Sequence, residues 1–202
     1  MAIFVLLHNI GLRGKRMHLL SALLFAISAN IDCLAIGLSY GIQSVRIDAR
    51  SNLVIAVIST AGTMLSMLAG EPLAALCSPD TANHIGAVLL ILIGLWILFQ
   101  NCFRKQKNLK EYDRDASGRI DMKEAVALAF ALTINNMGLG ISGSITGLPI
   151  FMTCSFTFLC SLLFIAAAQL AGKSWMASFI HKYAQAAAAW MIILLGILEC
   201  CI

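Results

Sequence analysis

Apolar residues in this chain come in long blocks that are separated by short polar connectors. Blocks of about 20 apolar residues, the length that crosses a lipid bilayer as a helix, recur along the sequence. They predict six membrane-spanning helices at residues 18–43, 53–77, 83–103, 121–145, 151–172 and 183–202. Gly147 and Pro149 mark a break between the fourth and fifth blocks, because both residues favour turns. The pattern therefore predicts an all-α integral membrane protein.

One long polar run, the linker from Arg104 to Glu124 (RKQKNLKEYDRDASGRIDMKE), interrupts these blocks. It divides the chain into two halves of similar size, residues 17–103 and 125–202, each with three predicted spans. Residues 1–16 combine a short apolar run with basic residues that follow it, which is the reverse of a cleaved signal peptide. We interpret them as a leader or an N-terminal extension, with Met17 as an alternative start.

Composition narrows the class further. Of the 202 residues, 60% are hydrophobic and 12% are charged, whereas a soluble globular domain usually has about 25% charged residues. The net charge of +4 therefore reflects orientation in a membrane and does not indicate nucleic-acid binding. The seven cysteines include no CxxC pair and lie mostly in apolar blocks, so a disulfide framework is not expected.

Basic residues are distributed unevenly between the two predicted sides of the membrane. Cytoplasmic loops carry an excess of Lys and Arg, so the richer side predicts the cytoplasm. Both termini are then predicted to lie outside, with the linker inside. The richer side carries Arg46, Arg50, Arg104, Lys105, Lys107, Lys110, Arg114, Arg119, Lys123, Lys173 and Lys182, and the other side carries Arg13, Lys15 and Arg16.

The two halves share an internal repeat. IDCLAIGLSYGI, from Ile31, aligns with INNMGLGISGSI, from Ile134, so that Asp32 corresponds to Asn135. LAGE and LAGK align later in each half, as do LIGL and LLGI. Because each half has an odd number of spans, the second must enter the membrane from the opposite face. The sequence predicts a 3+3 inverted repeat, an architecture that places binding sites near the bilayer midplane.

Asp32 is the acid that lies deepest inside a predicted span. A carboxylate there costs roughly 2.5–3.5 kcal/mol on insertion scales, so it must face the bundle interior and have partners. Hard divalent cations such as Mn²⁺ favour the oxygen-rich surroundings that the repeat predicts. The alternative is that Asp32 is a hydrogen-bonded polar pin between helices. The predicted ion site comprises Asp32, Asn30, Asn135, Asn136, Ser39 and Ser142, with Ser28 and Thr133 nearby.

Glycines surround this candidate site in both halves. Small residues let helix backbones approach closely, and they also permit local unwinding that exposes carbonyl groups. We expect them to bring the first and fourth spans together around the ion. The glycines are Gly37, Gly41, Gly138, Gly140 and Gly143.

The end of the linker fits a calcium-binding EF-hand loop from residue 113 to residue 124. Gly118 falls at the sharp turn, and Ile120 at the apolar anchor position. The alternative interpretation is a helix cap, since Asp121 and Glu124 have the spacing of a capping pair, and the two interpretations are compatible. The predicted Ca²⁺ ligands are Asp113, Asp115, Ser117, Arg119, Asp121 and Glu124.

SANIDCLAIGLSYGI, FALTINNMGLGIS and DRDASGRIDMKEA resemble the bacterial manganese-efflux pump family, in its sporulation-protein branch, over residues 17–202. The resemblance implies six spans, inverted repeats and membership of the lysine-exporter superfamily. It also implies that one Asp in the first span and one in the fourth support Mn²⁺ export. Asp32 occupies the first of these places. Asn135 occupies the second, which removes one negative charge from the implied site.

The favoured prediction is an inner-membrane exporter of Mn²⁺ or another divalent cation, not an enzyme, that works by alternating access, with a second copy of the chain among its expected partners. The alternative is a non-transporting sporulation membrane protein with a Ca²⁺-binding cytoplasmic loop. A thiol-relay oxidoreductase is disfavoured, because the counterpart of Cys33 is Asn136. Membrane hydrolysis is unsupported, because the sequence has no HExxH motif.

Overall fold

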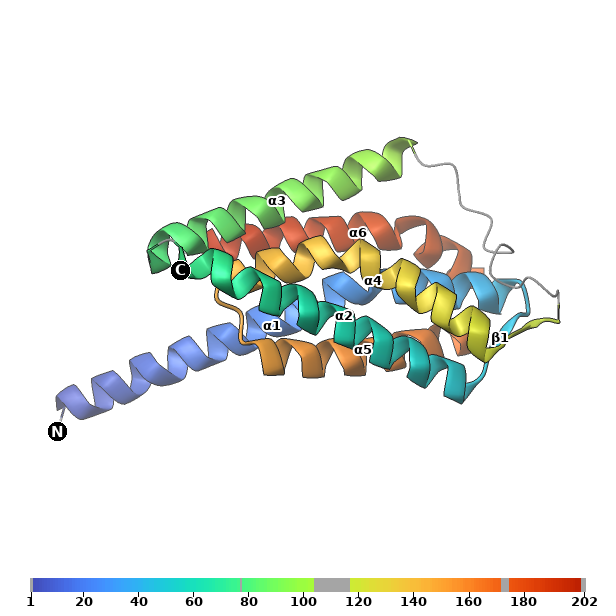
Figure 1. Ribbon diagram of the computed structural model, residues 1–202, viewed down its shortest axis with the longest axis horizontal. Coiled ribbons are helices and arrows are strands. Elements are labelled where there is room, and N and C mark those ends of the chain that lie inside the picture. The colour runs from blue at the N-terminus through green and yellow to red at the C-terminus, as the bar shows by residue number, and fades with distance from the viewer. Residues whose placement is uncertain (1, 77, 104–116, 172–174, 201–202) are drawn as a thin grey trace.

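The computed structural model describes residues 2–76, 78–103, 117–171 and 175–200 (Figure 1). Side chains are described from residue 19 onward, with gaps that include 101–103, Asn135, 175–182 and 185. The elements are α1 (Ala2–Ile42), β1 (Arg46–Ile47), α2 (Ala49–Ala75), α3 (Pro79–Phe103), β2 (Arg119–Ile120), α4 (Met122–Ile145), α5 (Ile150–Ala171) and α6 (Trp175–Cys200). The protein is a helical bundle in which the two short strands pair in parallel at one end.

The apolar blocks correspond to the helices. Within the described residues, four helical segments are long and apolar enough to cross a membrane: Leu19–Ile42, Ala49–Ala75, Asp80–Gln100 and Ile150–Ala171. α4 is a fifth if its two arms, which meet at 45° near Asn135, form one span. Ala186–Cys200 is a shorter apolar helix. The fold is therefore that of a multi-pass integral membrane protein.

α1 is longer than the sequence predicted. The helix starts at Ala2 and continues through the expected start of the span near His18 without a break. Figure 1 shows this first part projecting beyond the other helices, at the end of the bundle where α6 also ends. The predicted extension is thus a continuation of the first spanning helix.

Local sequence signals fix the ends of α4. Asp121 caps its start: the Glu124 backbone N–H donates to Asp121 Oδ1 at 2.9 Å, and the Asp121 N–H donates to Glu124 Oε2 at 3.2 Å. At the other end Gly147 has φ +77°. Its N–H and that of Leu148 donate to the carbonyls of Ser144 and Gly143, which is a Schellman motif. The predicted cap and the predicted turn are both confirmed.

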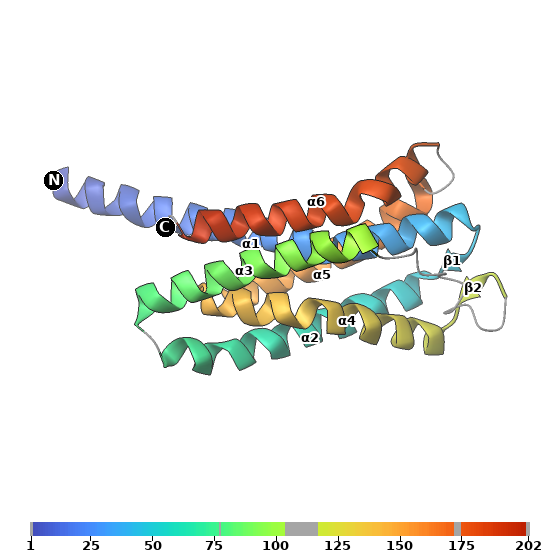
Figure 2. The ribbon, with the colours of Figure 1, turned by 90° about the horizontal axis from the view of Figure 1, so that it is seen from above.

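The helices of one half pack mainly on those of the other half. α1 lies along α5 and α6, α2 lies along α4 and α5, and α3 lies along α6 and α4 (Figures 1 and 2). Within a half, α2 with α3 and α5 with α6 touch only briefly. Neither half therefore has a substantial core of its own.

Of four apolar clusters among the described residues, the two largest lie toward opposite ends of the bundle. The strand-end cluster lies next to β1 and β2 and includes Tyr40, Ile55, Ile120, Leu132 and Ile165. The opposite-end cluster includes Phe25, Ala29, Met67, Leu139 and Cys154.

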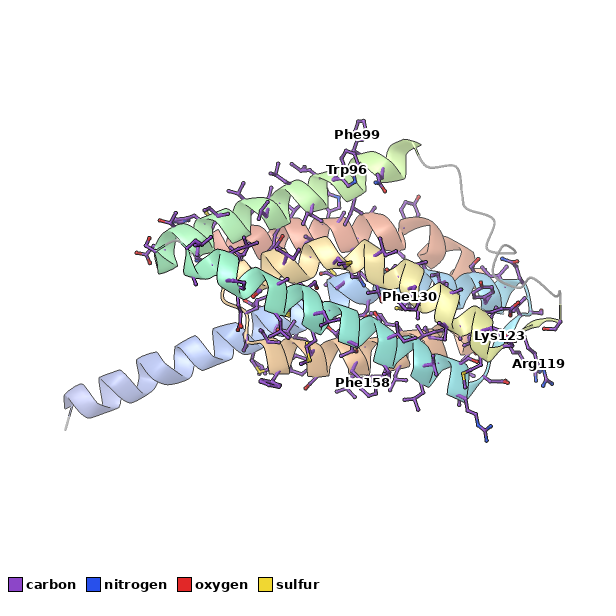
Figure 3. The ribbon with its side chains drawn as sticks, viewed as in Figure 1. Trp96, Phe99, Arg119, Lys123, Phe130 and Phe158 are labelled. Atoms are coloured by element: carbon purple, nitrogen blue, oxygen red, sulfur yellow. The ribbon has the colours of Figure 1, made fainter. Side chains whose placement is uncertain are left out.

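Large apolar side chains also cover the outside of the bundle. Leu65 is 67% exposed and Trp190 is 63% exposed. Figure 3 shows Trp96 and Phe99 of α3 pointing away from the bundle. Apolar surface of this extent is expected where lipid replaces water as the surrounding solvent.

Candidate functional site: a buried polar layer

A layer of buried polar side chains separates the two apolar clusters about halfway along the bundle. Each is at most 2% exposed, and together they come from α1, α2, α4 and α5. Burying polar groups is costly unless they find partners, and lipid offers none, so polar groups gathered at one depth indicate a functional site. The polar layer comprises Asn30, Ser59, Thr63, Asn136, Thr157 and Ser161.

The order of residues along each helix shows the depth of this layer. On α4, Asn136 lies between Leu132 of the strand-end cluster and Leu139 of the opposite-end cluster. The other three helices show the same arrangement. On α1, Asn30 lies between Ala29 and Cys33, and on α2, Ser59 and Thr63 lie between Ile55 and Met67. On α5, Thr157 and Ser161 lie between Cys154 and Ile165.

The part of the layer between α1 and α5 is internally bonded. Asn30 donates from Nδ2 to the Ala26 carbonyl at 2.8 Å, and its Oδ1 accepts from the Cys33 thiol at 3.7 Å. The Cys33 sulfur also lies 3.8 Å from Ser161 Oγ. Asn30, Cys33 and Ser161 therefore each have at least one partner at this α1–α5 contact, whereas Thr157 Oγ1, also on α5, has none among the described residues.

The part of the layer between α4 and α2 differs. Asn136 Nδ2 and Ser59 Oγ are buried and have no hydrogen-bond partner among the described residues. In the register of the repeat, Asn136 corresponds to Cys33 and Ser59 corresponds to Ser161. The two positions that are joined between α1 and α5 are thus both unsatisfied between α4 and α2. A buried polar group left unpaired costs about 1–3 kcal/mol.

Asp32 is half-buried beside the α1–α5 contact. Its Oδ1 accepts the backbone N–H of Cys33 at 2.8 Å, which fixes the carboxylate next to the layer. Its predicted counterpart, Asn135, has a side chain outside the described residues. α1 and α4 themselves touch only briefly, so the pairing of Asp32 with Asn135 stays a prediction.

The glycines bring different helices together from those we expected. A Cβ added to Gly37 would lie 2.7 Å from Ala168 Cβ, on α5. A Cβ added to Gly140 would meet Ser66 on α2, with the Thr63 carbonyl at 3.3 Å. The glycines therefore allow the α1–α5 and α4–α2 approaches. Gly143 is the exception: a Cβ added there would lie 2.8 Å from Phe25 Cε2 on α1, so this glycine lies where the first and fourth spans meet, as expected.

Ser39 and Ser142 lie outside the polar layer. Ser39 is seven residues after Asp32, about 10 Å along the helix, and its hydroxyl accepts from Gln43 Nε2 at 3.2 Å. Ser142 donates to the Gly138 carbonyl at 2.9 Å. The structure places Asn30 and Asn136 in the layer and adds four hydroxyl residues of α2 and α5 that the sequence reading missed.

The donors available in the layer are carbonyl and hydroxyl oxygens, one neighbouring carboxylate and one thiol. Among the described residues, no group of three or more His, Cys, Asp or Glu side chains is arranged to hold a metal ion. A cation in this layer would therefore rely on Asp32 for charge and on neutral oxygens for the rest of its coordination. Such a set suits a hard divalent cation.

The second candidate site, the linker loop, is described from Ser117 onward, and Asp113 and Asp115 lie outside the described residues. Gly118 has φ +72°, the left-handed conformation that the sharp turn of the loop needs. The Ser117 hydroxyl bonds the N–H and the carbonyl of Arg119 at 3.3 and 3.0 Å. Asp121 and Glu124 form the capping box of α4.

The connection between α1 and α2 holds this loop in place. Arg46 and Ile47 pair with Arg119 and Ile120, and the Ser51 hydroxyl donates to the Ile120 carbonyl at 2.9 Å. Ile120 is 1% exposed and belongs to the strand-end cluster. The first half of the chain therefore supplies a parallel strand partner for this loop.

The two ends of the bundle differ in charge. The basic residues whose side chains are described, Arg46, Arg50, Arg119 and Lys123, all lie at the end that carries the strands (Figure 3). At the opposite end the described charged side chains are acids: Glu71, Asp80 and Glu199.

Comparison with known proteins defines the class. Residues 7–98 and 100–198 match the family described as "Mntp: Putative manganese efflux pump". The chain belongs to this family.

One relative is the "Probable sporulation protein YtaF" of Bacillus subtilis (strain 168), which is 32% identical over 175 aligned residues. The alignment covers 72% of this chain and 82% of the relative. No solved structure matches. The resemblance seen in the sequence is confirmed.

Proposed function

We propose that the protein exports a divalent cation, Mn²⁺ in the first instance, across the inner membrane by alternating access around the polar layer. Membership of the efflux family supports the substrate. The observation that carries the proposal is the polar layer itself, with Asn136 and Ser59 unsatisfied and Asp32 alongside. A cation bound there would be shielded by an apolar cluster on either side.

Alternating access requires two arrangements of the same helices, which an inverted repeat provides. We propose that the six helices form such a repeat, and reciprocal packing supports it. A Cβ added to Gly94 would lie 3.0 Å from the Ala189 carbonyl, and one added to Gly196 would lie 2.8 Å from the Ala87 carbonyl. Gly94 corresponds to Gly196 and Ala87 to Ala189, so each helix makes the contact that its counterpart makes.

We propose that the strand-bearing end faces the cytoplasm. The basic side chains gathered there support this orientation, because cytoplasmic loops are enriched in Lys and Arg. In this orientation the end where α1 starts and α6 ends faces outward, and the cation leaves there.

The test is Mn²⁺ export from cells that lack their own manganese exporter. Asp32→Asn keeps the shape of the side chain and removes its charge, so it should abolish protection against Mn²⁺ and slow efflux at least about tenfold, a loss of about 1.4 kcal/mol or more in transition-state stabilisation. Asp80→Asn, at the exposed start of α3, is the matched control. Asn135→Asp should raise efflux, because it restores the second carboxylate that the family pattern implies. Equal protection by the parent and Asp32→Asn chains would refute the proposal.

A second candidate is a Ca²⁺-responsive sporulation protein. The name of the relative suggests a role in sporulation. The left-handed turn at Gly118 favours a metal loop. Ca²⁺ should protect residues 104–124 of the parent chain from protease, and Asp113→Asn combined with Asp115→Asn should remove that protection. Identical digestion of parent and variant in Ca²⁺ would exclude a calcium site.

A further inference from the structure

The buried hydroxyls of this bundle fall into two groups. Several donate back to a carbonyl of their own helix: Ser28 to Leu24 at 2.7 Å, Thr63 to Ser59 at 3.0 Å and Ser142 to Gly138 at 2.9 Å. Such back-bonding is how Ser and Thr ordinarily satisfy themselves in membrane helices. Hydroxyls that do not bond to their own helix are therefore available to bind another group.

α5 carries a run of such hydroxyls on successive turns. Thr153, Thr157 and Ser161 are each 0% exposed and lie four residues apart, which spaces them by about 6 Å along the helix. Thr153 Oγ1 and Thr157 Oγ1 have no hydrogen-bond partner among the described residues. Ser161 Oγ contacts the Cys33 thiol of the polar layer. We call these three residues the hydroxyl ladder.

The hydroxyl ladder begins within the layer at Ser161 and Thr157 and extends beyond it at Thr153. Thr153 lies one turn from the start of α5, at the end of the bundle opposite β1 and β2 (Figure 1). In the register that aligns Leu68–Glu71 with Leu170–Lys173, Ser161 corresponds to Ser59 and Thr157 corresponds to Ile55. Ile55 is 0% exposed and belongs to the strand-end cluster. At this repeat position the second half therefore has a hydroxyl, that of Thr157, whereas the first half has the apolar side chain of Ile55.

We propose that Thr153, Thr157 and Ser161 form the outer half of the cation path, in which hydroxyl oxygens replace part of the hydration shell of a divalent cation as it leaves the layer. Hydroxyl oxygens suit a hard cation and add no charge that would trap it. Ile55 closes the corresponding route toward the strands. This inference rests on the proposed export function.

The first measurement is Mn²⁺ efflux by Thr157→Val, which keeps the branched shape and removes the oxygen. Efflux should fall about tenfold, and Thr157→Ser should retain most of it. Ser155→Ala, on the exposed side of the same helix, is the matched control and should be unchanged. Melting temperatures of the purified chains show whether each variant is folded. Parental efflux by folded Thr157→Val would overturn the proposal.

The second measurement does not depend on transport. Intact cells carrying Thr157→Cys are treated with a membrane-impermeant thiol reagent, and labelled peptides are identified by mass. The cysteine at 157 should be labelled, whereas one introduced at Ser155 should not, because it faces lipid. If the parent chain exports no Mn²⁺, the proposed export function is refuted, and the labelling result alone shows whether the hydroxyl ladder is reachable from outside. Absence of label at 157 would overturn it.

Discussion

The α1–α5 and α4–α2 contacts are built alike and differ in chemistry. In the first, Cys33 and Ser161 meet at 3.8 Å and Asn30 completes the contact. In the second, their counterparts Asn136 and Ser59 are buried at the same depth, and each has an atom without a partner among the described residues. The difference shows that two contacts in matching sequence register can differ, with Cys33 and Ser161 bonded to each other in one and Asn136 and Ser59 left with unpaired atoms in the other. Three predictions test that difference.

The largest effect is expected from Asn136→Cys, which copies the α1–α5 contact into the α4–α2 position. A thiol there can meet the Ser59 hydroxyl, so the unsatisfied amide is removed. Efflux should fall at least about tenfold while the melting temperature holds or rises, because an unpaired buried polar group costs about 1–3 kcal/mol.

Cys33→Ser, at the contact that is already bonded, is its control and should change efflux far less. Normal efflux by Asn136→Cys would show that the α4–α2 contact has no special part in binding.

An intermediate effect on stability is expected from the paired glycines. Gly37→Ala places a methyl 2.7 Å from Ala168 Cβ and 3.1 Å from the Ile165 carbonyl, where backbone cannot yield. It should destabilise the bundle by about 1–3 kcal/mol through overpacking. Gly140→Ala meets the Ser66 hydroxyl, which can rotate, and should cost less.

Denaturant titration of the purified chains in detergent gives the comparison. Gly138→Ala is the control, because its nearest neighbour would be 3.5 Å away. A larger loss for Gly140→Ala than for Gly37→Ala would contradict the packing difference.

The smallest effect is expected at the starts of α4 and α2, the two helices of the α4–α2 contact. Asp121→Ala removes the capping box of α4 and should cost about 1 kcal/mol. Asp48→Ala should cost little, because Asp48 precedes α2 without a side-chain cap. Melting curves of the two variants measure both effects, and equal shifts in melting temperature would argue against a stabilising cap at Asp121.

Much of the fold could be predicted from the sequence because local signals determine it. Apolar length placed α2 to α5 within a few residues, and Asp121, Glu124 and Gly147 fixed the ends of α4. The neighbours of each helix could not be predicted in this way. Aligning Asp32 with Asn135 suggested that α1 meets α4, but a two-fold related pair need not touch, and Gly37 packs on α5.

The polar layer shows a similar limit. Asn30 and Asn136 stood out because amides are rare in apolar runs. Ser59, Thr157 and Ser161 did not, because a hydroxyl that bonds its own helix and one that faces an interior look the same in sequence. The four-residue spacing of Thr153, Thr157 and Ser161 on α5 was the available signal. Burial and the absence of back-bonding together distinguish Thr153 and Thr157 from Ser155, which is exposed and donates to the Phe151 carbonyl.

The way each half packs on the other constrains how the protein can be made and how it could have arisen. Residues 17–103 would leave the ribosome with three helices that have little to hold one another, and they must wait in the membrane for α4 to α6. On the proposed inverted repeat, a single-half ancestor would have needed a second copy of itself, inserted in the opposite orientation, to be stable. Joining two such copies in one polypeptide would have removed the need to insert one gene product both ways.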